Sequence, residues 1–180
     1  MHRTTVLVIT ILLGACKPPA SDDYLARAQT SEVRTSPREP IASPESEGAA
    51  WALGQSGRLL YGQPGEAPYF ALGCEDGALV FTRFAAADPG AKAVLALIGN
   101  GHVERLWIDA EQEADDVWLW RGRVAADDPR LEVLTGPRQV EATVPGAGSL
   151  KLNPSNAPRD YIAECASGIV PEPAPEASAT

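Results

Sequence analysis

Histidine and cysteine, on which many catalytic and metal sites depend, are scarce in this sequence. Its 180 residues include two histidines and three cysteines, and His2 stands next to the initiating methionine. The sequence has no His-Glu-x-x-His, Cys-x-x-Cys or Gly-x-Ser-x-Gly motif, which are the usual signals of a zinc site, a redox pair and a serine hydrolase. We therefore predict no catalytic residues, no metal site and no cofactor, and we expect that the chain is not an enzyme.

The sequence also lacks an apolar run long enough to cross a membrane. The longest candidate, residues 4–13, has ten residues, whereas a spanning helix needs about twenty. This run follows the basic Arg3 and ends at small residues, an arrangement typical of a secretion signal. We predict that residues 1–15 are a signal peptide that is removed.

The residues at the end of this run carry a more specific pattern. Leu13-Gly14-Ala15-Cys16 resembles the lipobox of bacterial lipoproteins. The resemblance implies a diacylglyceryl group on the sulfur of Cys16, cleavage before it, and an amino terminus acylated by a chain such as palmitate. Lys17 follows where an Asp would favour the inner membrane, so we expect a lipid anchor on the periplasmic side, with the outer membrane favoured. The alternative is an ordinary secretion signal with an incidental cysteine.

Positive charge is the third scarcity. Without residues 1–15, which contain one charged side chain, the chain has 14 Lys and Arg against 24 Asp and Glu, a net charge of −10. A phosphate backbone would repel such a molecule on average. We expect membrane attachment through lipid on Cys16 and another envelope protein as partner, and no nucleic acid.

Aromatic residues mark one folded domain. Residues 51–168 hold all four Trp, every Phe and three of the four Tyr. Residues 16–50 and 169–180 are rich in Pro, Ser and Glu, and such segments bury too little apolar surface to offset the entropy of ordering. We predict a lipidated, flexible tether at residues 16–50, a β-rich globular domain at residues 51–168, and a disordered tail at residues 169–180.

Within the domain the hydrophobic period is mostly two, which is typical of half-buried strands. Turn residues separate three pairs of strand-like segments: residues 69–75 and 78–84 flank Asp76-Gly77, residues 92–98 and 102–108 flank Asn100-Gly101, and residues 140–144 and 149–152 flank Pro145-Gly146-Ala147-Gly148. Trp118, Trp120 and Val124 indicate one face of a further strand. The predicted fold is mainly β, a small antiparallel sheet forming a sandwich or a barrel.

Two predicted helices interrupt the strands. The first is a short helix that Asp128 would cap at its N-terminus. Pro129 would take its first position, and Gly136 would follow its last residue. A second helix begins near Ser155 or Asn156. Its apolar residues recur at helical spacing, which predicts a C-terminal helix packed on the sheet; these residues are Pro158, Tyr161, Ile162 and Cys165.

If Cys16 carries lipid, Cys74 and Cys165 remain. Export would place both in an oxidising compartment, which favours a disulfide in a domain with a modest core. The disulfide would tie the last helix to the sheet. Two buried free thiols are the alternative.

The candidate binding residues lie in and beside an acidic segment. Asp109, Glu111 and Glu113, with Asp115 and Asp116, predict an acidic loop between two strands. The loop is interpreted as a solvated hairpin tip rather than a calcium site, because it lacks the Gly and the closing acid of an EF-hand.

Trp107 is the remaining candidate binding residue. It lies on the opposite face of its strand from Leu106 and Ile108, so it is either a core residue or an exposed binding residue, whereas Trp118 and Trp120 are expected in the core. His102, beside the Asn100-Gly101 turn, is interpreted as a solvated strand end.

Several short motifs carry a family resemblance. They are Tyr61-Gly62, Leu72-Gly73-Cys74, Gly146-Ala147-Gly148-Ser149-Leu150, Leu152-Asn153-Pro154 and Tyr161-Ile162-x-x-Cys165. With them, residues 51–168 resemble a group of uncharacterised envelope proteins from sphingomonad-type alphaproteobacteria. The resemblance implies an envelope protein and brings no known activity. Because the sequence has no catalytic motif, we expect a membrane-anchored envelope lipoprotein that is a noncatalytic binding or structural module.

A second resemblance supplies an alternative function. Residues 69–84, with Cys74-Glu75-Asp76-Gly77, are similar to the opening strands of membrane-bound inhibitors of c-type lysozyme, which are small lipid-anchored β-barrels with a disulfide. Their Ser-Gly-x-x-Tyr inhibitory loop has no match here. This resemblance implies a lipid-anchored enzyme inhibitor, and an envelope hydrolase is the least favoured of the three classes.

Overall fold

The computed structural model describes residues 39–114 and 116–169 of the chain. The predicted signal peptide, the predicted lipidation site Cys16, the predicted tether up to residue 38 and the predicted tail from residue 170 lie outside the described residues.

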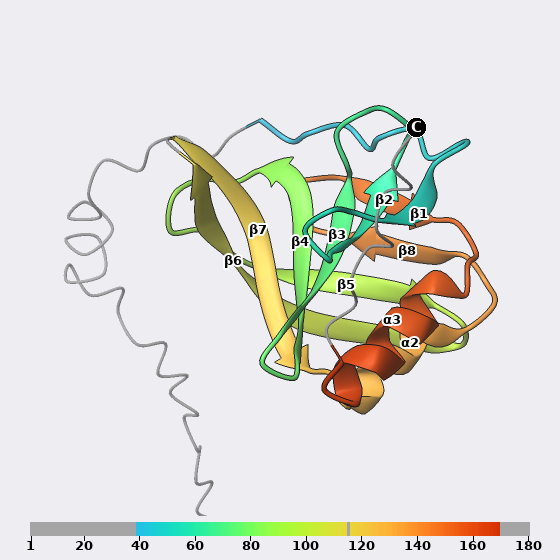
Figure 1. The fold of residues 1–180 in the computed structure, drawn as a ribbon. Helices are drawn as coiled ribbons and strands as arrows, with labels where there is room; N and C mark the ends of the chain where they lie inside the picture. Colours follow the sequence, from blue (N-terminus) through green and yellow to red (C-terminus); the bar gives the residue numbers. More distant parts are fainter. Residues whose placement is uncertain (1–38, 115, 170–180) are drawn as a thin grey trace, which may run out of the picture. The chain divides into compact units, whose positions relative to one another are not determined.

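The described chain is mainly β, as the sequence predicts. Its elements are β1 (Ala50–Leu53), β2 (Leu59–Gly62), β3 (Phe70–Glu75), β4 (Ala78–Ala86), β5 (Lys92–Gly99), β6 (His102–Ala114), β7 (Val117–Ala125), η1 (Pro129–Leu131), α2 (Glu132–Thr135), β8 (Val140–Thr143), β9 (Ser149–Leu152) and α3 (Ala157–Ala166). The strands form one antiparallel sheet in the order β1-β2-β3-β4-β7-β6-β5-β8-β9. The sheet curls into a nearly closed, barrel-like layer with α2 and α3 together at one end (Figure 1).

The three predicted hairpins are confirmed. Asn100 and Gly101 join β5 to β6 with φ of 51° and 88°, and the flanking Gly99 and His102 pair directly. Positive φ at both central residues matches the twist of a two-residue hairpin, which is why Asn-Gly is favoured there. Asp76-Gly77 joins β3 to β4 with the same signs of φ, and β8 pairs with β9 across the third loop.

The core fills the inside of the curled sheet with residues from alternate positions. Leu106 and Ile108 of β6 are buried, and so are Leu95 and Leu97 of β5. Trp120 is buried as predicted, whereas Trp118 is half-buried against the same cluster. In β5 and β6 one face therefore meets the core and the other faces outward, whereas β3 and β4 are buried on both faces over residues 70–73 and 79–83.

Tyr61 links two strands that are distant in the order of the sheet. Its hydroxyl donates to the carbonyl oxygen of Lys151 at 2.9 Å and accepts from the amide of Asn153 at 3.0 Å. Its ring is fully buried and packs on Trp51, with 5.0 Å between ring centroids. Burial raises the pKa of the Tyr61 hydroxyl above its usual value. Tyr61 thus connects β2 to β9 and its following residue, near the closure of the sheet.

The folded part begins earlier than residue 51, where the sequence analysis placed it. The amide of Ile41 donates to the carbonyl of Gly146 at 2.8 Å, and the Ser43 hydroxyl accepts from the amide of Ser149 at 2.9 Å. The side chain of Asn153 donates to the carbonyl of Ser46 at 2.8 Å. These polar contacts hold residues 41–46 beside β9. The composition of this segment, poor in apolar residues, hid its place in the domain.

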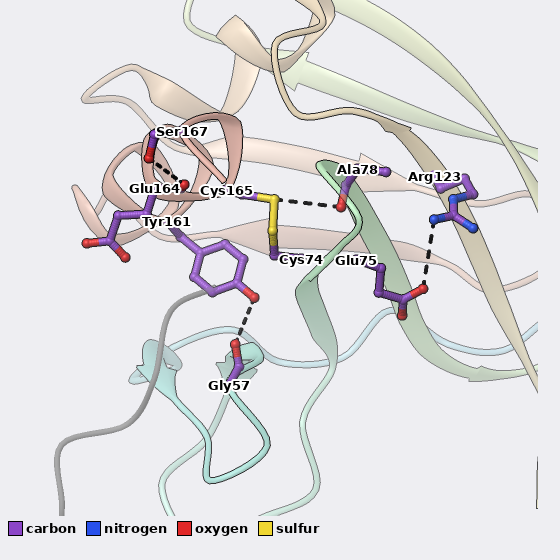
Figure 2. Close-up of a disulfide and its surroundings, with 9 residues drawn as sticks. All are labelled: Gly57, Cys74, Glu75, Ala78, Arg123, Tyr161, Glu164, Cys165 and Ser167. Carbon is purple, nitrogen blue, oxygen red and sulfur yellow. Dashed lines mark hydrogen bonds and ion pairs between the residues drawn. A yellow bond between two sulfur atoms is a disulfide. The ribbon is translucent and has the colours of Figure 1, made fainter. Parts of the chain in front are cut away.

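The predicted disulfide is present between Cys74 of β3 and Cys165 of α3 (Figure 2). Cys165 is fully buried, and the other residues on the predicted apolar face of α3 are also buried: Pro158, Tyr161 and Ile162. Tyr161, one turn earlier, donates its hydroxyl to the carbonyl of Gly57 at 2.8 Å. The helix is therefore tied to the sheet by a covalent bond, a hydrogen bond and apolar packing.

The predicted short helix is also found, as η1 followed by α2. Asp128 caps it by accepting from the amide of Arg130 at 2.9 Å, and hydrogen bonds from the side chain of the same arginine lower the pKa of Asp128. The side chain of Asn100 donates to the carbonyl of Val133 and accepts from the amide of Arg138, both at 2.9 Å. The β5–β6 turn thereby holds α2 in place.

Among residues 39–114 and 116–169, no helix has the length and apolar character needed to cross a membrane.

Candidate binding site on the outer face of strands β6 and β7

The acidic segment is not a loop, and this corrects the sequence analysis. β6 continues to Ala114 and β7 begins at Val117, so Asp109, Glu111 and Glu113 lie within a strand. The segment was misassigned because its alternate residues are small or polar and give no apolar signal of a strand. Asp109 and Glu111 are two residues apart in regular pairing, so they project from the same, outer side of the sheet. Glu113 lies at a register shift between Gln112 and Ala114.

Two arginines of β7 lie beside these acids. Arg121 pairs across the strands with Asp109, and its guanidinium lies 2.9 Å from Glu75 and 3.6 Å from Glu111. Arg123 lies 4.0 Å from the other oxygen of Glu75 (Figure 2). Glu75 follows the disulfide cysteine on β3, and its side chain points to the opposite side of that strand. The arginines and acids thus form an ion-paired cluster on the outer face.

The cluster lies where two strands separate. β6 and β7 pair from the hairpin only as far as Asp109 and Arg121. Beyond that point β6 pairs with β5, and β7 pairs with β4. Figure 1 shows β6 and β7 side by side near their hairpin and diverging from it. We call the point of separation the fork.

A glycine permits the close approach of the strands at the fork. A Cβ added to Gly122 would lie 2.4 Å from the carbonyl oxygen of Trp107 and 2.7 Å from a side-chain carbon of Ile108. Any larger residue would push the strands apart. Gly122 therefore keeps the backbones of β6 and β7 in contact where their pairing ends.

A hollow of about 330 Å³ lies at the fork. We call it the fork hollow; its functional side chains are Glu75, Trp107, Asp109, Glu111, Arg121 and Arg123. The hollow is near the lower end of the volumes typical of small-molecule sites. It brings together Trp107, Asp109 and Glu111, three of the four predicted binding residues.

Trp107 is the most exposed large apolar side chain of the described residues. It is 77% exposed, which rules out the alternative of a core residue. Val94 lies opposite it on β5 and is half-buried, and Ile98 and Val103 form an exposed pair further along the same two strands. The pair of Ala96 and the charged Arg105 lies between them, so the apolar side chains do not form a continuous strip, and Trp107 stands at the hollow.

Glu113, the fourth predicted residue, is not a lining residue of the hollow. It lies 3.8 Å from the guanidinium of Arg58. That guanidinium also donates to the hydroxyl of Thr82 at 2.9 Å and stacks over the ring of Phe84 at 5.4 Å. Glu113 thus belongs to a neighbouring set of contacts that covers the outer face of β4.

His102 lies at the start of β6, outside the fork hollow. Its side chain is 37% exposed, and its ring nitrogens lie 4.0 Å from Glu104 and 3.8 Å from Glu132. The prediction of a solvated strand end is accurate only in part. Glu132, which is distant in sequence, lies beside the His102 ring because α2 packs near the start of β6. Within the described ranges, no group of three His, Cys, Asp or Glu side chains is arranged to hold a metal ion.

The sequence analysis missed Glu75, Arg121 and Arg123. The two arginines could have been found from their spacing. Arg121 and Arg123 are two residues apart within a predicted strand, which places both side chains on one face. Glu75 gave no such signal.

No family model matches the chain, and no curated protein or solved structure matches it.

Proposed function

We propose that this protein is a lipid-anchored lipoprotein of the bacterial envelope and a noncatalytic binding module that uses the fork hollow for recognition. The observation that carries the binding proposal is the exposed Trp107 beside a hollow lined by paired charges. Aromatic and arginine side chains are the residues most enriched where proteins recognise partners. We further propose that this domain is related to the sphingomonad-type envelope proteins that it resembles.

The lipobox and the disulfide support the location. The lipobox supplies the anchor on Cys16, and the disulfide between Cys74 and Cys165 is consistent with an oxidising compartment. Lys17 supports the outer membrane over the inner one. Replacement of Cys16 by Ser is expected to abolish acyl labelling and to leave an uncleaved precursor, as seen by metabolic labelling and gel mobility. A soluble product of mature size from that variant would contradict the anchor.

The chemistry of the fork hollow supports binding rather than catalysis. Its six functional side chains include no serine, cysteine or histidine, so it has no Ser-His or Cys-His pair for nucleophilic catalysis. Arg121 contacts two carboxylates, Glu75 and Glu111. Charged groups held by one another present a structured surface, which suits recognition.

Photo-crosslinking in intact cells tests the binding surface. A photoreactive amino acid at Arg105, exposed on the same face two residues before Trp107, is expected to form a discrete adduct with an envelope component. The adduct is expected to disappear when Trp107→Ala is added. The matched control carries the photoreactive residue at the exposed Lys151 of β9. Equal adducts from both positions, unaffected by Trp107→Ala, would contradict the proposal.

Lysozyme inhibition is the alternative function. The curled sheet and the disulfide are features that lysozyme inhibitors also have, so they favour this alternative over an enzyme activity. Purified protein added in excess to c-type lysozyme separates the two functions. The binding proposal predicts unchanged lysis of cell walls, whereas stoichiometric inhibition would establish the alternative.

A further inference from the structure

The lining of the fork hollow carries charges of both signs in nearly equal number. Three carboxylates, those of Glu75, Asp109 and Glu111, face the two guanidinium groups of Arg121 and Arg123. Lys92 does not line the hollow, but its ammonium lies 3.3 Å from Asp109 and offsets the remaining negative charge. A strongly anionic ligand would meet the carboxylates, and a strongly cationic one would meet the arginines. The charge balance therefore favours a neutral ligand.

The same groups offer both kinds of hydrogen bond side by side. A guanidinium has five donor hydrogens, and a carboxylate has about four acceptor sites, so paired groups at 2.9–4.0 Å retain capacity for further partners. A ligand that fits this arrangement carries groups that both donate and accept, as hydroxyl groups do.

Trp107 supplies an apolar surface at the same place. Its side chain is 77% exposed, so its ring is available for stacking against a flat apolar face. The indole is large, rigid and loses little conformational entropy on binding. Val80, an apolar residue of β4, adds to the lining. A ligand with an apolar face and a polar rim would complement both parts of the hollow.

From this combination we infer that the fork hollow binds a neutral, polyhydroxylated sugar of an oligosaccharide. The C–H face of a pyranose ring would stack on Trp107, and its hydroxyl groups would bond to Arg121, Arg123 and Glu75. This inference rests on the proposed binding function and names the class of ligand for that site. A peptide or a polyanion is a separate outcome that the test distinguishes.

The test is an NMR titration of the purified full chain in a zwitterionic detergent without a sugar headgroup. The probes are two neutral trisaccharides, one of N-acetylglucosamine and one of glucose, and the signals are the indole N–H of Trp107 and the Nε–H groups of Arg121 and Arg123. At least one trisaccharide is expected to shift these signals with a Kd at or below about 1 mM. Because the chain has four tryptophans, the assignment uses Trp107→Phe.

Matched variants separate stacking from general hydrophobicity. Trp107→Ala and Trp107→Leu are expected to weaken binding about tenfold, whereas Trp107→Tyr, which keeps an aromatic face, is expected to weaken it less than about threefold. Leu53→Ala, at an exposed residue of β1, is expected to leave the Kd unchanged. Equal binding by the Leu and Tyr variants would overturn the stacking arrangement.

Three outcomes distinguish this inference from the proposed function. No saturable shift with either trisaccharide at ten times that concentration would overturn the sugar inference, and a crosslink dependent on Trp107 would still uphold the binding function. Stronger shifts of the same signals by a polyphosphate or by a basic peptide would also overturn the neutral-sugar inference. Absence of both the shifts and the crosslink would overturn both proposals.

Discussion

Removal of the disulfide measures how far the last helix depends on it. The test variant replaces both Cys74 and Cys165 by Ala, because a Ser at the fully buried position 165 would add an unsatisfied hydroxyl. Helix α3 keeps its buried apolar face and the hydrogen bond from Tyr161 to Gly57. We therefore expect the variant to fold, with a lower free energy of unfolding.

The magnitude follows from the length of chain that the bond closes. The two cysteines are 91 residues apart, which corresponds to about 4–5 kcal/mol at 25 °C in the chain-entropy model. Removing a native disulfide from a small secreted domain costs about 2–5 kcal/mol in practice. Since small domains have about 5–15 kcal/mol in total, the loss would be a large share of the stability of this domain.

Urea denaturation followed by tryptophan fluorescence measures the change. The midpoint is expected to fall and the slope to rise, because the unfolded chain without the bond is less compact and exposes more surface. Adding reductant is expected to bring the wild-type protein to the values of the variant and to leave the variant unchanged. A loss below about 1 kcal/mol, or two thiols that alkylate in the folded protein, would refute the reasoning.

Three further predictions concern the sheet. Tyr61→Phe is expected to lower the free energy of unfolding by about 1–3 kcal/mol, since it leaves the Lys151 carbonyl and the Asn153 amide without their partner; an unchanged urea midpoint would contradict it. Burial raises the pKa of the Tyr61 and Tyr161 hydroxyls, so the free energy of unfolding is expected to be fully present below about pH 10 and to fall above it as the unfolded chain ionises first. Urea titrations from pH 8 to 11 check this, and a double Phe variant with the same alkaline slope as wild type would disprove it. Gly122→Ala is expected to destabilise the fold by about 1–3 kcal/mol because its Cβ meets the Trp107 carbonyl; a thermal midpoint equal to that of wild type would show that the strands at the fork adjust freely.

Local chemistry explains which parts of the fold the sequence could predict. Asn100-Gly101 and Asp76-Gly77 define their own backbone angles, so both hairpins were predictable from two residues each. The apolar spacing of α3 predicted its buried face. The pairing of Cys74 with Cys165 was predicted from the oxidising compartment that a predicted signal peptide would imply, with free thiols as the alternative.

Long-range register explains what the sequence could not predict. The pairing of β4 with β7 and the separation of β6 from β7 join segments through the order of the whole sheet. Glu75 meets Arg121 across 46 residues of sequence, and no local pattern marks that contact. The sequence predicted the residues of the fork hollow that lie on β6. The two arginines and the third carboxylate could be assigned to the hollow only from the folded structure.

The most direct test of the binding surface is hydroxyl-radical labelling of Trp107 in its native setting. Trp107 is 77% exposed and Leu53 of β1 is 39% exposed in the isolated chain, so both should be labelled in the purified protein. In intact envelopes, we expect labelling of Trp107 to fall several-fold, because a ligand or partner covers it, while labelling of Leu53 stays the same. Equal labelling of Trp107 in envelopes and in the purified protein would contradict the assignment of the fork hollow as the recognition site.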